Sequence, residues 1–125
     1  MEILYIDSET DTDITSIRAG WLKHDGHTVD VASGINVPFD SYDLVIVNLG
    51  VRNEQSDMRE ILANANIAGK RNNLGKNFLF TGVDREDLLF AKTHRAEYCH
   101  TYQLAQDTSR DAILEKATGT SLVRG

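Results

Sequence analysis

Polar residues stand at the ends of several short apolar runs, and Asn48 is the most informative of them. The run from Asp43 to Asn48 is apolar throughout its middle, as in a strand buried on both faces. A carboxylate at such a strand end could accept a phosphoryl group. A carboxamide is neutral and a feeble nucleophile, and it cannot form a stable acyl phosphate. The amide of Asn48 therefore argues against group transfer at this position.

Three other strand ends carry polar residues that could share a site with Asn48. Asp7 and Ser8 follow the first apolar run, Thr81 ends the fourth run and Thr101 ends the fifth. In open parallel sheets, ligands and chemistry lie beyond the carboxyl ends of the strands. We therefore expect these side chains to gather at one edge of a sheet.

Five short runs are predicted to be strands, at residues 3–6, 27–32, 43–48, 78–81 and 97–101. Helical patterns separate most of them, and this alternation predicts an α/β fold with a parallel sheet and helices on both faces. Only residues 33–41 separate the second strand from the third, so the second helix is expected to be short or missing.

Capping residues and apolar spacing predict where the helices begin and which faces they bury. Thr10 or Asp11 caps the first helix, which ends at Asp25 and Gly26. Further helices are predicted to begin at Asn53 or Glu54, at Asp84, and at Asp107 or Thr108. The expected core faces are Ile14, Ile17, Trp21 and Leu22 in the first helix, Met58, Ile61, Leu62 and Ala65 in the next, and Ile113, Leu114 and Ala117 in the last.

The composition limits the class of protein. The chain has 125 residues, 41% of them hydrophobic, and a net charge of −6, which fits one acidic globular domain and argues against nucleic-acid binding. It has no apolar stretch of membrane-spanning length and no basic leader after Met1. Cys99 is the single cysteine, which fits a reducing cytosol. We expect a cytoplasmic domain over residues 1–118, with 119–125 as a tail or the start of a linker.

Four segments resemble the receiver domain of bacterial two-component response regulators. Residues 3–9 (ILYIDSE) resemble its first strand and acidic pair, and residues 42–50 (YDLVIVNLG) resemble its third strand and phosphoacceptor. Residues 78–82 (FLFTG) resemble the fourth strand with its switch threonine, and residues 96–101 (AEYCHT) the fifth strand with its switch aromatic and lysine. The resemblance implies a flavodoxin-like sheet with strand order 2-1-3-4-5.

Three charged parts of the receiver's phosphorylation site are replaced in this sequence. The acidic pair that would hold Mg²⁺ keeps Asp7 but has Ser8 beside it, with Glu9 following. Asn48 occupies the phosphoacceptor position, and Thr101 replaces the lysine that would neutralise the phosphoryl group. The resemblance implies a degenerate acidic pocket of Asp7, Ser8, Glu9 and Thr101 around Asn48, with no catalytic residue, no cofactor, and at most weak metal contact through Asp7.

Thr81 and Tyr98 match the two signal-transmitting positions of the family, although Thr81 could equally be an ordinary strand-end threonine. The resemblance implies a pseudo-receiver that is not an enzyme and signals by protein contact without phosphorylation. Its implied partners are a histidine kinase or phosphotransferase, met through Arg18 and Lys23 of the first helix, and a second copy of the chain. The surface expected to form the homodimer comprises the fourth helix, fifth strand and fifth helix, with Asp87, Lys92, Arg95, Tyr98, Tyr102 and Gln106.

Two alternatives stay open from the sequence. The chain could be the regulatory half of a transcription factor whose DNA-binding domain lies outside it. It could also be a small-molecule binder that uses the vacated acidic pocket.

Overall fold

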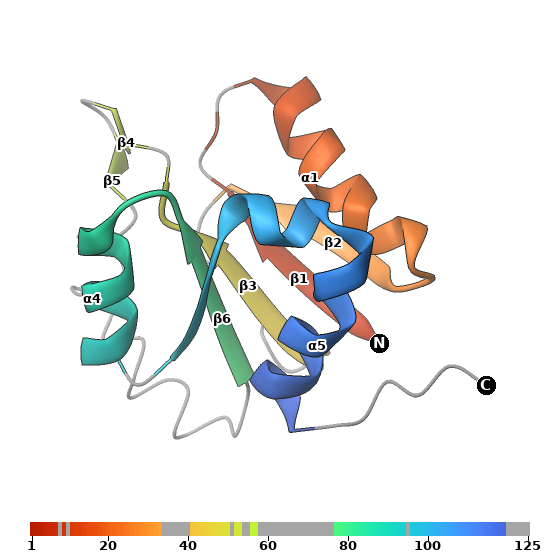
Figure 1. The fold of residues 1–125 in the computed structure, drawn as a ribbon. Coiled ribbons are helices and arrows are strands. Elements are labelled where there is room, and N and C mark those ends of the chain that lie inside the picture. The colour runs from red at the N-terminus through yellow and green to blue at the C-terminus, as the bar shows by residue number, and fades with distance from the viewer. Residues whose placement is uncertain are drawn as a thin grey trace.

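A parallel sheet of five strands forms the centre of the computed structural model, which describes residues 1–7, 9, 11–33, 41–50, 52–53, 56–57, 77–94 and 96–119. The strands are β1 (Glu2–Ile6), β2 (Thr28–Ala32), β3 (Leu44–Asn48), β6 (Asn77–Gly82) and β7 (Glu97–His100). Their spatial order is β2-β1-β3-β6-β7, and every neighbouring pair is parallel (Figure 1). The predicted order 2-1-3-4-5 is confirmed.

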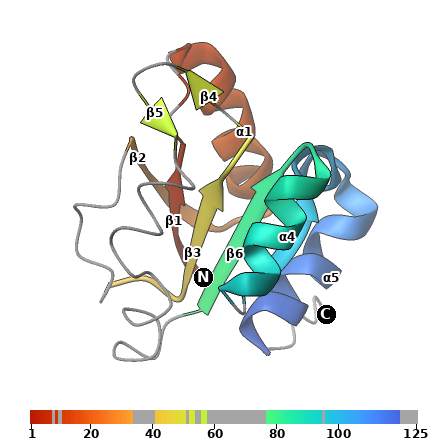
Figure 2. The same ribbon diagram turned by 90° about the vertical axis from the view of Figure 1, so that its left-hand side faces the viewer.

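Helices cover both faces of this sheet. The helices α1 (Thr12–His24) and α5 (Asp107–Thr118) pack on one face, where Leu22 and Leu114 join a buried cluster with Tyr5. The helix α4 (Arg85–Thr93) packs on the other face, where Ala91 joins a cluster with Phe80. Figure 2 shows α1 and α4 on opposite sides of β3. The described residues contain no helix between β2 and β3, in agreement with a second helix that is short or missing.

The helix α1 begins and ends as predicted. The side chain of Asp11 accepts a hydrogen bond from the backbone N–H of Asp13 at 3.0 Å. Asp25 caps the carboxyl end, and Gly26 follows it with φ +88°, a left-handed conformation that glycine adopts without a steric penalty.

The predicted core face of α1 is wrong in its first two turns. Ile14 and Ile17 are 36% and 59% exposed, whereas the buried residues are Thr15, Ala19 and Leu22. The helix is thus rotated so that a less apolar stripe faces the sheet. The reason lies in the polar contacts that this stripe makes at the carboxyl end of β1, described below.

Two other helix starts differ from the prediction. Residues Arg52–Asn53 (β4) and Ser56–Asp57 (β5) pair as a short antiparallel ribbon, so no helix begins at Asn53. The rest of that predicted helix lies outside the described residues. A 3-10 helix, η1 (Thr101–Ala105), follows β7, and α5 then begins after Gln106, with no side-chain cap from Asp107 or Thr108.

The start of α4 is confirmed. The side chain of Asp84 accepts a hydrogen bond from the backbone N–H of Asp87 at 3.0 Å, which satisfies one of the free donors of the first turn. None of the described helices is both long enough and apolar enough to cross a membrane.

Candidate functional site at the carboxyl edge of the sheet

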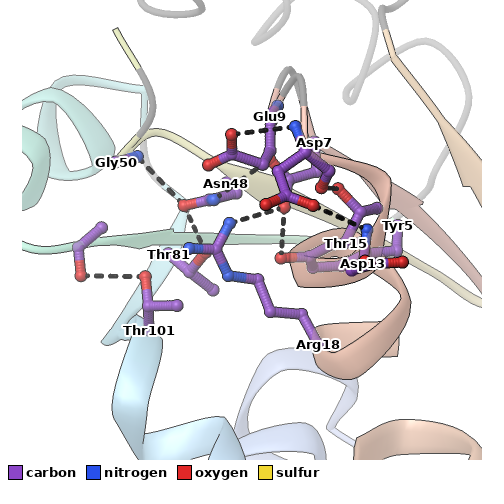
Figure 3. A network of polar contacts seen from close by, with 12 residues as sticks. Tyr5, Asp7, Glu9, Asp13, Thr15, Arg18, Asn48, Gly50, Thr81 and Thr101 are labelled. Carbon is purple, nitrogen blue, oxygen red and sulfur yellow. Dashed lines mark hydrogen bonds and ion pairs between the residues drawn. The ribbon is translucent and has the colours of Figure 1, made fainter. Parts of the chain in front are cut away.

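The carboxyl ends of β1, β3 and β6 bring Asp7, Asn48 and Thr81 together, as predicted from the strand ends (Figure 3). Asn48 Nδ2 donates to Asp7 Oδ1 at 3.3 Å, and Thr81 Oγ1 donates to Asn48 Oδ1 at 3.4 Å. All three residues are almost completely buried. They form one continuous hydrogen-bonded chain across three neighbouring strands.

The carboxylate of Asp7 accepts four hydrogen bonds. Its Oδ1 accepts from the backbone N–H of Glu9 at 2.9 Å and from the Asn48 amide. Its Oδ2 accepts from the hydroxyl of Tyr5 at 3.0 Å and from the guanidinium of Arg18 at 2.9 Å. A carboxylate offers about four lone-pair sites, so the described contacts use its full accepting capacity.

Arg18 supplies the positive charge next to Asp7. Figure 3 shows its side chain reaching from α1 toward Asp7. The ion pair joins Nη1 to Oδ2, with the Arg18 side chain 20% exposed and that of Asp7 fully buried. Burial lowers the pKa of Arg18, but the hydrogen bond to Asp7 and the negative groups nearby outweigh burial and raise that pKa. Arg18 is therefore only partly exposed and engaged with Asp7, and its contact with a partner stays a prediction.

Tyr5 is the second donor to Asp7 Oδ2 and comes from the sheet itself. It is 1% exposed. Burial, followed by the negative charge of Asp7, raises the pKa of Tyr5 well above its ordinary value. The phenol is therefore a neutral donor at physiological pH, and together with Arg18 it hydrogen-bonds the buried Oδ2 of Asp7.

Asn48 uses both ends of its amide. Its Oδ1 accepts from the backbone N–H of Gly50 at 3.0 Å and from Thr81, while its Nδ2 donates to Asp7. An aspartate at this position would place a second carboxylate oxygen against Asp7 Oδ1, where only a donor is favourable. The carboxamide is thus matched to the buried carboxylate beside it.

The side chains of Thr101 and Glu9 take no part in this chain of contacts. Thr101 is buried at the end of β7, but its Oγ1 donates to the backbone oxygen of Gly82 at 3.2 Å. The carboxylate of Glu9 accepts from the backbone N–H of Asp11 at 3.1 Å. Ser8 lies outside the described residues.

Tyr98 is half-buried against the core cluster that contains Phe80. Its hydroxyl donates to the backbone oxygen of Asp84 at 3.5 Å. Burial, and then the charge of Asp87, raises the pKa of Tyr98 to about 12. No described contact links Tyr98 to Thr81, and its predicted switch role stays a prediction.

Dimer formation stays a prediction, and the exposure expected of its surface is found at some of its residues. Lys92, Tyr102 and Gln106 are exposed. Asp87 is completely buried because its carboxylate turns inward and accepts from the backbone N–H of Val83 at 3.1 Å, so its predicted exposure is wrong. Arg95 lies outside the described residues.

Sequence reasoning missed Arg18 and Tyr5 as members of this site. Helical spacing could have indicated Arg18, because it lies three residues after Thr15 and four before Leu22 and so on the same side of α1 as these buried residues. The alternation of side chains along β1 could have indicated Tyr5. Residues two apart in a strand point to the same face, and Tyr5 precedes Asp7 by two residues.

Solved structures that are similar to this chain include receiver domains of response regulators. A two-component response regulator from Clostridium difficile is 19% identical and gives a TM-score of 0.62, with 93% of this chain and 97% of that chain covered. A response regulator receiver domain protein from Methanospirillum hungatei JF-1 is 16% identical, with a TM-score of 0.58 and coverage of 95% and 98%. The signal receiver domain of a signal transduction histidine kinase from Syntrophus aciditrophicus is 18% identical, with a TM-score of 0.60 and coverage of 99% and 97%.

These likenesses establish that the chain has the fold of response-regulator receiver domains. No model of a known protein family matches the sequence, and a comparison with curated proteins also gave no match.

Proposed function

We propose that this receiver-like domain signals by protein contact and does not accept a phosphoryl group. The observation that carries the proposal is the ion pair between Asp7 and Arg18, with 2.9 Å between Nη1 and Oδ2. Asp7 is the carboxylate that a receiver would offer to Mg²⁺, and here a side chain of the same protein already neutralises it. The domain is accordingly proposed to be neither an enzyme nor metal-dependent.

The chemistry of phosphoryl transfer supports this proposal. Mg²⁺ demands near-octahedral oxygen ligands and loses its water reluctantly, so a carboxylate that accepts four hydrogen bonds is a poor ligand. Asn48 adds no negative charge and no nucleophile. Phosphoryl transfer depends almost entirely on positioning and electrostatic stabilisation, and both the metal ligand and the acceptor are compromised here.

Phosphorylation can be tested with acetyl phosphate and Mg²⁺, read out by intact-protein mass spectrometry. The wild-type chain is expected to gain no phosphoryl mass. Asn48→Asp alone is also expected to stay unlabelled. The guanidinium of Arg18 would then lie beside the carboxylates of residues 7 and 48, and its positive charge would occupy the place where Mg²⁺ would bind. In the double variant Asn48→Asp, Arg18→Ala, that guanidinium is gone, and we expect the first Mg²⁺-dependent labelling there.

The outcomes separate the parts of the proposal. Stoichiometric, Mg²⁺-dependent labelling of the wild type would overturn it. Labelling of the Asn48→Asp single variant would show that Arg18 does not keep the metal out, and would leave the missing acceptor as the only barrier.

Exposed apolar side chains on α1 support protein contact through that helix. Ile14 and Ile17 are large and apolar, and they are 36% and 59% exposed on the side of α1 that faces away from the sheet. Neighbouring apolar groups on one helix face are typical of protein interfaces. The resemblance to receivers makes a histidine kinase or phosphotransferase the proposed partner, which the domain would occupy without being phosphorylated.

This contact can be tested by measuring Kd values for histidine-kinase dimerisation domains and histidine phosphotransferases of the source organism. Ile17→Glu is expected to weaken binding at least about tenfold, as for a central interface residue. Leu89→Glu is the matched control, since Leu89 is 47% exposed on α4. If Leu89→Glu abolishes binding and Ile17→Glu does not, the contact surface is α4. If nothing binds and the chain is a stable dimer by light scattering, the kinase proposal is wrong.

A further inference from the structure

A cavity of about 290 Å³ lies between α1 and the carboxyl end of β2. Asp7 and Glu9, which follow β1, line one end of the cavity. Asn48 and Thr81 are not among the described residues that line it. It shares Asp7 and Glu9 with the predicted acidic pocket but extends along α1 as far as Lys23. Its existence follows from how α1 covers the sheet.

The register of β1 and β2 shows where α1 leaves the sheet open. Val31 on β2 pairs with Tyr5 on β1, so the two side chains lie on the same face of the sheet. Tyr5 is 1% exposed beneath α1, whereas Val31 is 47% exposed. The helix thus covers β1 and stands away from the end of β2, and Val31 and Ala19 form an apolar wall of the cavity.

The polar residues of the cavity carry opposite charges near its two ends. Glu9 lies at the end near β1 and forms no ion pair with another residue in the described part of the chain. Lys23 lies near the other end, on the last turn of α1. Between them, α1 presents the hydroxyl groups of Thr12 and Ser16. Asp7 is already paired with Arg18, so among the described lining residues Glu9 is the carboxylate without an ion pair, with one oxygen accepting from the Asp11 N–H.

We propose that this cavity binds a small linear zwitterion, with its ammonium group at Glu9 and its carboxylate at Lys23. Methylene groups between the charges would lie on Val31 and Ala19, and the hydroxyl groups of α1 would hydrogen-bond the polar ends. Binding of this kind goes beyond the proposed function and does not depend on it, because the proposed ligand contacts Glu9 and Lys23 and needs no phosphoacceptor.

The length of the helix sets the length of the ligand. Thr12 and Lys23 are separated by eleven residues, which is about 16 Å along the axis. Side chains on a helix tilt toward its N-terminus, so the ammonium of Lys23 reaches back toward Glu9. We therefore expect an optimum of about 10 Å between the two charges of the ligand.

A series of linear amino acids tests this proposal by ¹⁵N–¹H NMR titration of the whole chain. The probes are β-alanine, aminohexanoate and aminooctanoate, with octylamine and octanoate as single-charge controls. Aminooctanoate is expected to bind most tightly, with saturable shifts of the Ser16, Ala19 and Ser33 amides, which lie in the lining of the cavity. Each single-charge control is expected to bind about fivefold more weakly, as for the loss of one partly exposed ion pair.

Charge-neutral variants of Glu9 and Lys23 test which residue contacts the ammonium of the ligand and which contacts its carboxylate. Glu9→Gln should remove the advantage of aminooctanoate over octanoate, and Lys23→Gln should remove its advantage over octylamine. Lys92→Gln, an exposed lysine on α4, should change nothing. Equal affinity for octylamine and aminooctanoate, shifts confined to other parts of the chain, or no saturation with any probe would each overturn the proposal. Unchanged Thr81 and Leu114 amide positions in the free variants verify that the fold is intact.

Discussion

At the scale of single residues, the carboxyl edge of the sheet is held by complementary hydrogen bonding around one buried charge. Tyr5, Arg18 and the Asn48 amide all donate hydrogen bonds to the carboxylate of Asp7. Such a network is stabilising only while every member keeps its partner, because an unpaired buried polar group is costly. Each of these side chains is therefore specified by its neighbours.

Removing the guanidinium should measurably destabilise the fold. Arg18→Ala leaves the fully buried side chain of Asp7 without its counter-charge, and we expect a loss of about 2 kcal/mol in the free energy of unfolding. Urea denaturation, followed by the fluorescence of Trp21, measures this loss. Lys92→Ala removes an exposed lysine on α4 and should cost less than about 0.5 kcal/mol. Equal losses in the two variants would show that the ion pair contributes nothing.

At the scale of elements, the strands were predictable and the orientation of α1 was not. The runs around Ile46 and Phe80 are apolar because helices bury both faces of the sheet, and their ends converge at Asn48 and Thr81 as expected. The strands differ from the prediction by at most one residue at either end. These local patterns suffice because the geometry of a parallel sheet places consecutive strand ends together.

The face of α1 depends on a contact that local patterns do not contain. Counting apolar residues favours the stripe with Ile14 and Ile17, while the observed stripe contains Thr15 and Arg18. The stripe with Thr15 and Arg18 faces the sheet because Arg18 pairs with the buried carboxylate of Asp7, which lies eleven residues earlier and follows another element. The burial of Asp87 has the same origin, since its carboxylate satisfies a backbone N–H of the preceding loop.

The junction between β6 and α4 allows no side chain at residue 82. A Cβ added to Gly82 would lie 2.5 Å from the Cβ of Asp87 and 2.7 Å from its Cγ, and neither atom is the end of a flexible side chain. Gly82→Ala is expected to destabilise the fold by about 1–3 kcal/mol, because α4 must shift away from the sheet.

Gly20→Ala is the matched control for that substitution. Gly20 lies inside α1, and an added Cβ would meet nothing within 4 Å. Alanine should stabilise this position by about 0.5–1 kcal/mol, because it loses less conformational entropy in a helix than glycine does. Thermal melts of both variants should therefore shift in opposite directions, and a common direction would contradict the account of Gly82.

At the scale of the whole molecule, Arg110 joins the three elements α5, η1 and α1. It is 1% exposed on α5, and its Nε donates to the backbone oxygen of Leu104 in η1 at 2.7 Å. Its Nη1 pairs with Asp25, the carboxyl cap of α1, at 2.8 Å. This contact spans 85 residues of sequence, and no local pattern around Arg110 indicated it.

Breaking this contact should cost more than breaking a surface pair on the same helix. Arg110→Met removes the buried guanidinium that donates to Asp25 and to the Leu104 carbonyl, and we expect a loss of about 3–5 kcal/mol on urea denaturation. Lys116→Met removes a 77% exposed side chain whose ammonium lies 3.7 Å from Glu97, and should cost less than about 1 kcal/mol. Similar midpoints for the two variants would mean that Arg110 is only a space-filling side chain.

The guanidinium beside Asp7 belongs to the polypeptide, so it cannot dissociate, be chelated or be exchanged. A site that binds a divalent ion changes its charge with the concentration of that ion. The site around Asp7 contains its own positive charge as soon as the chain has folded. Under the proposed function, a cell could vary such a signal only through the number of copies it makes and the molecules those copies meet.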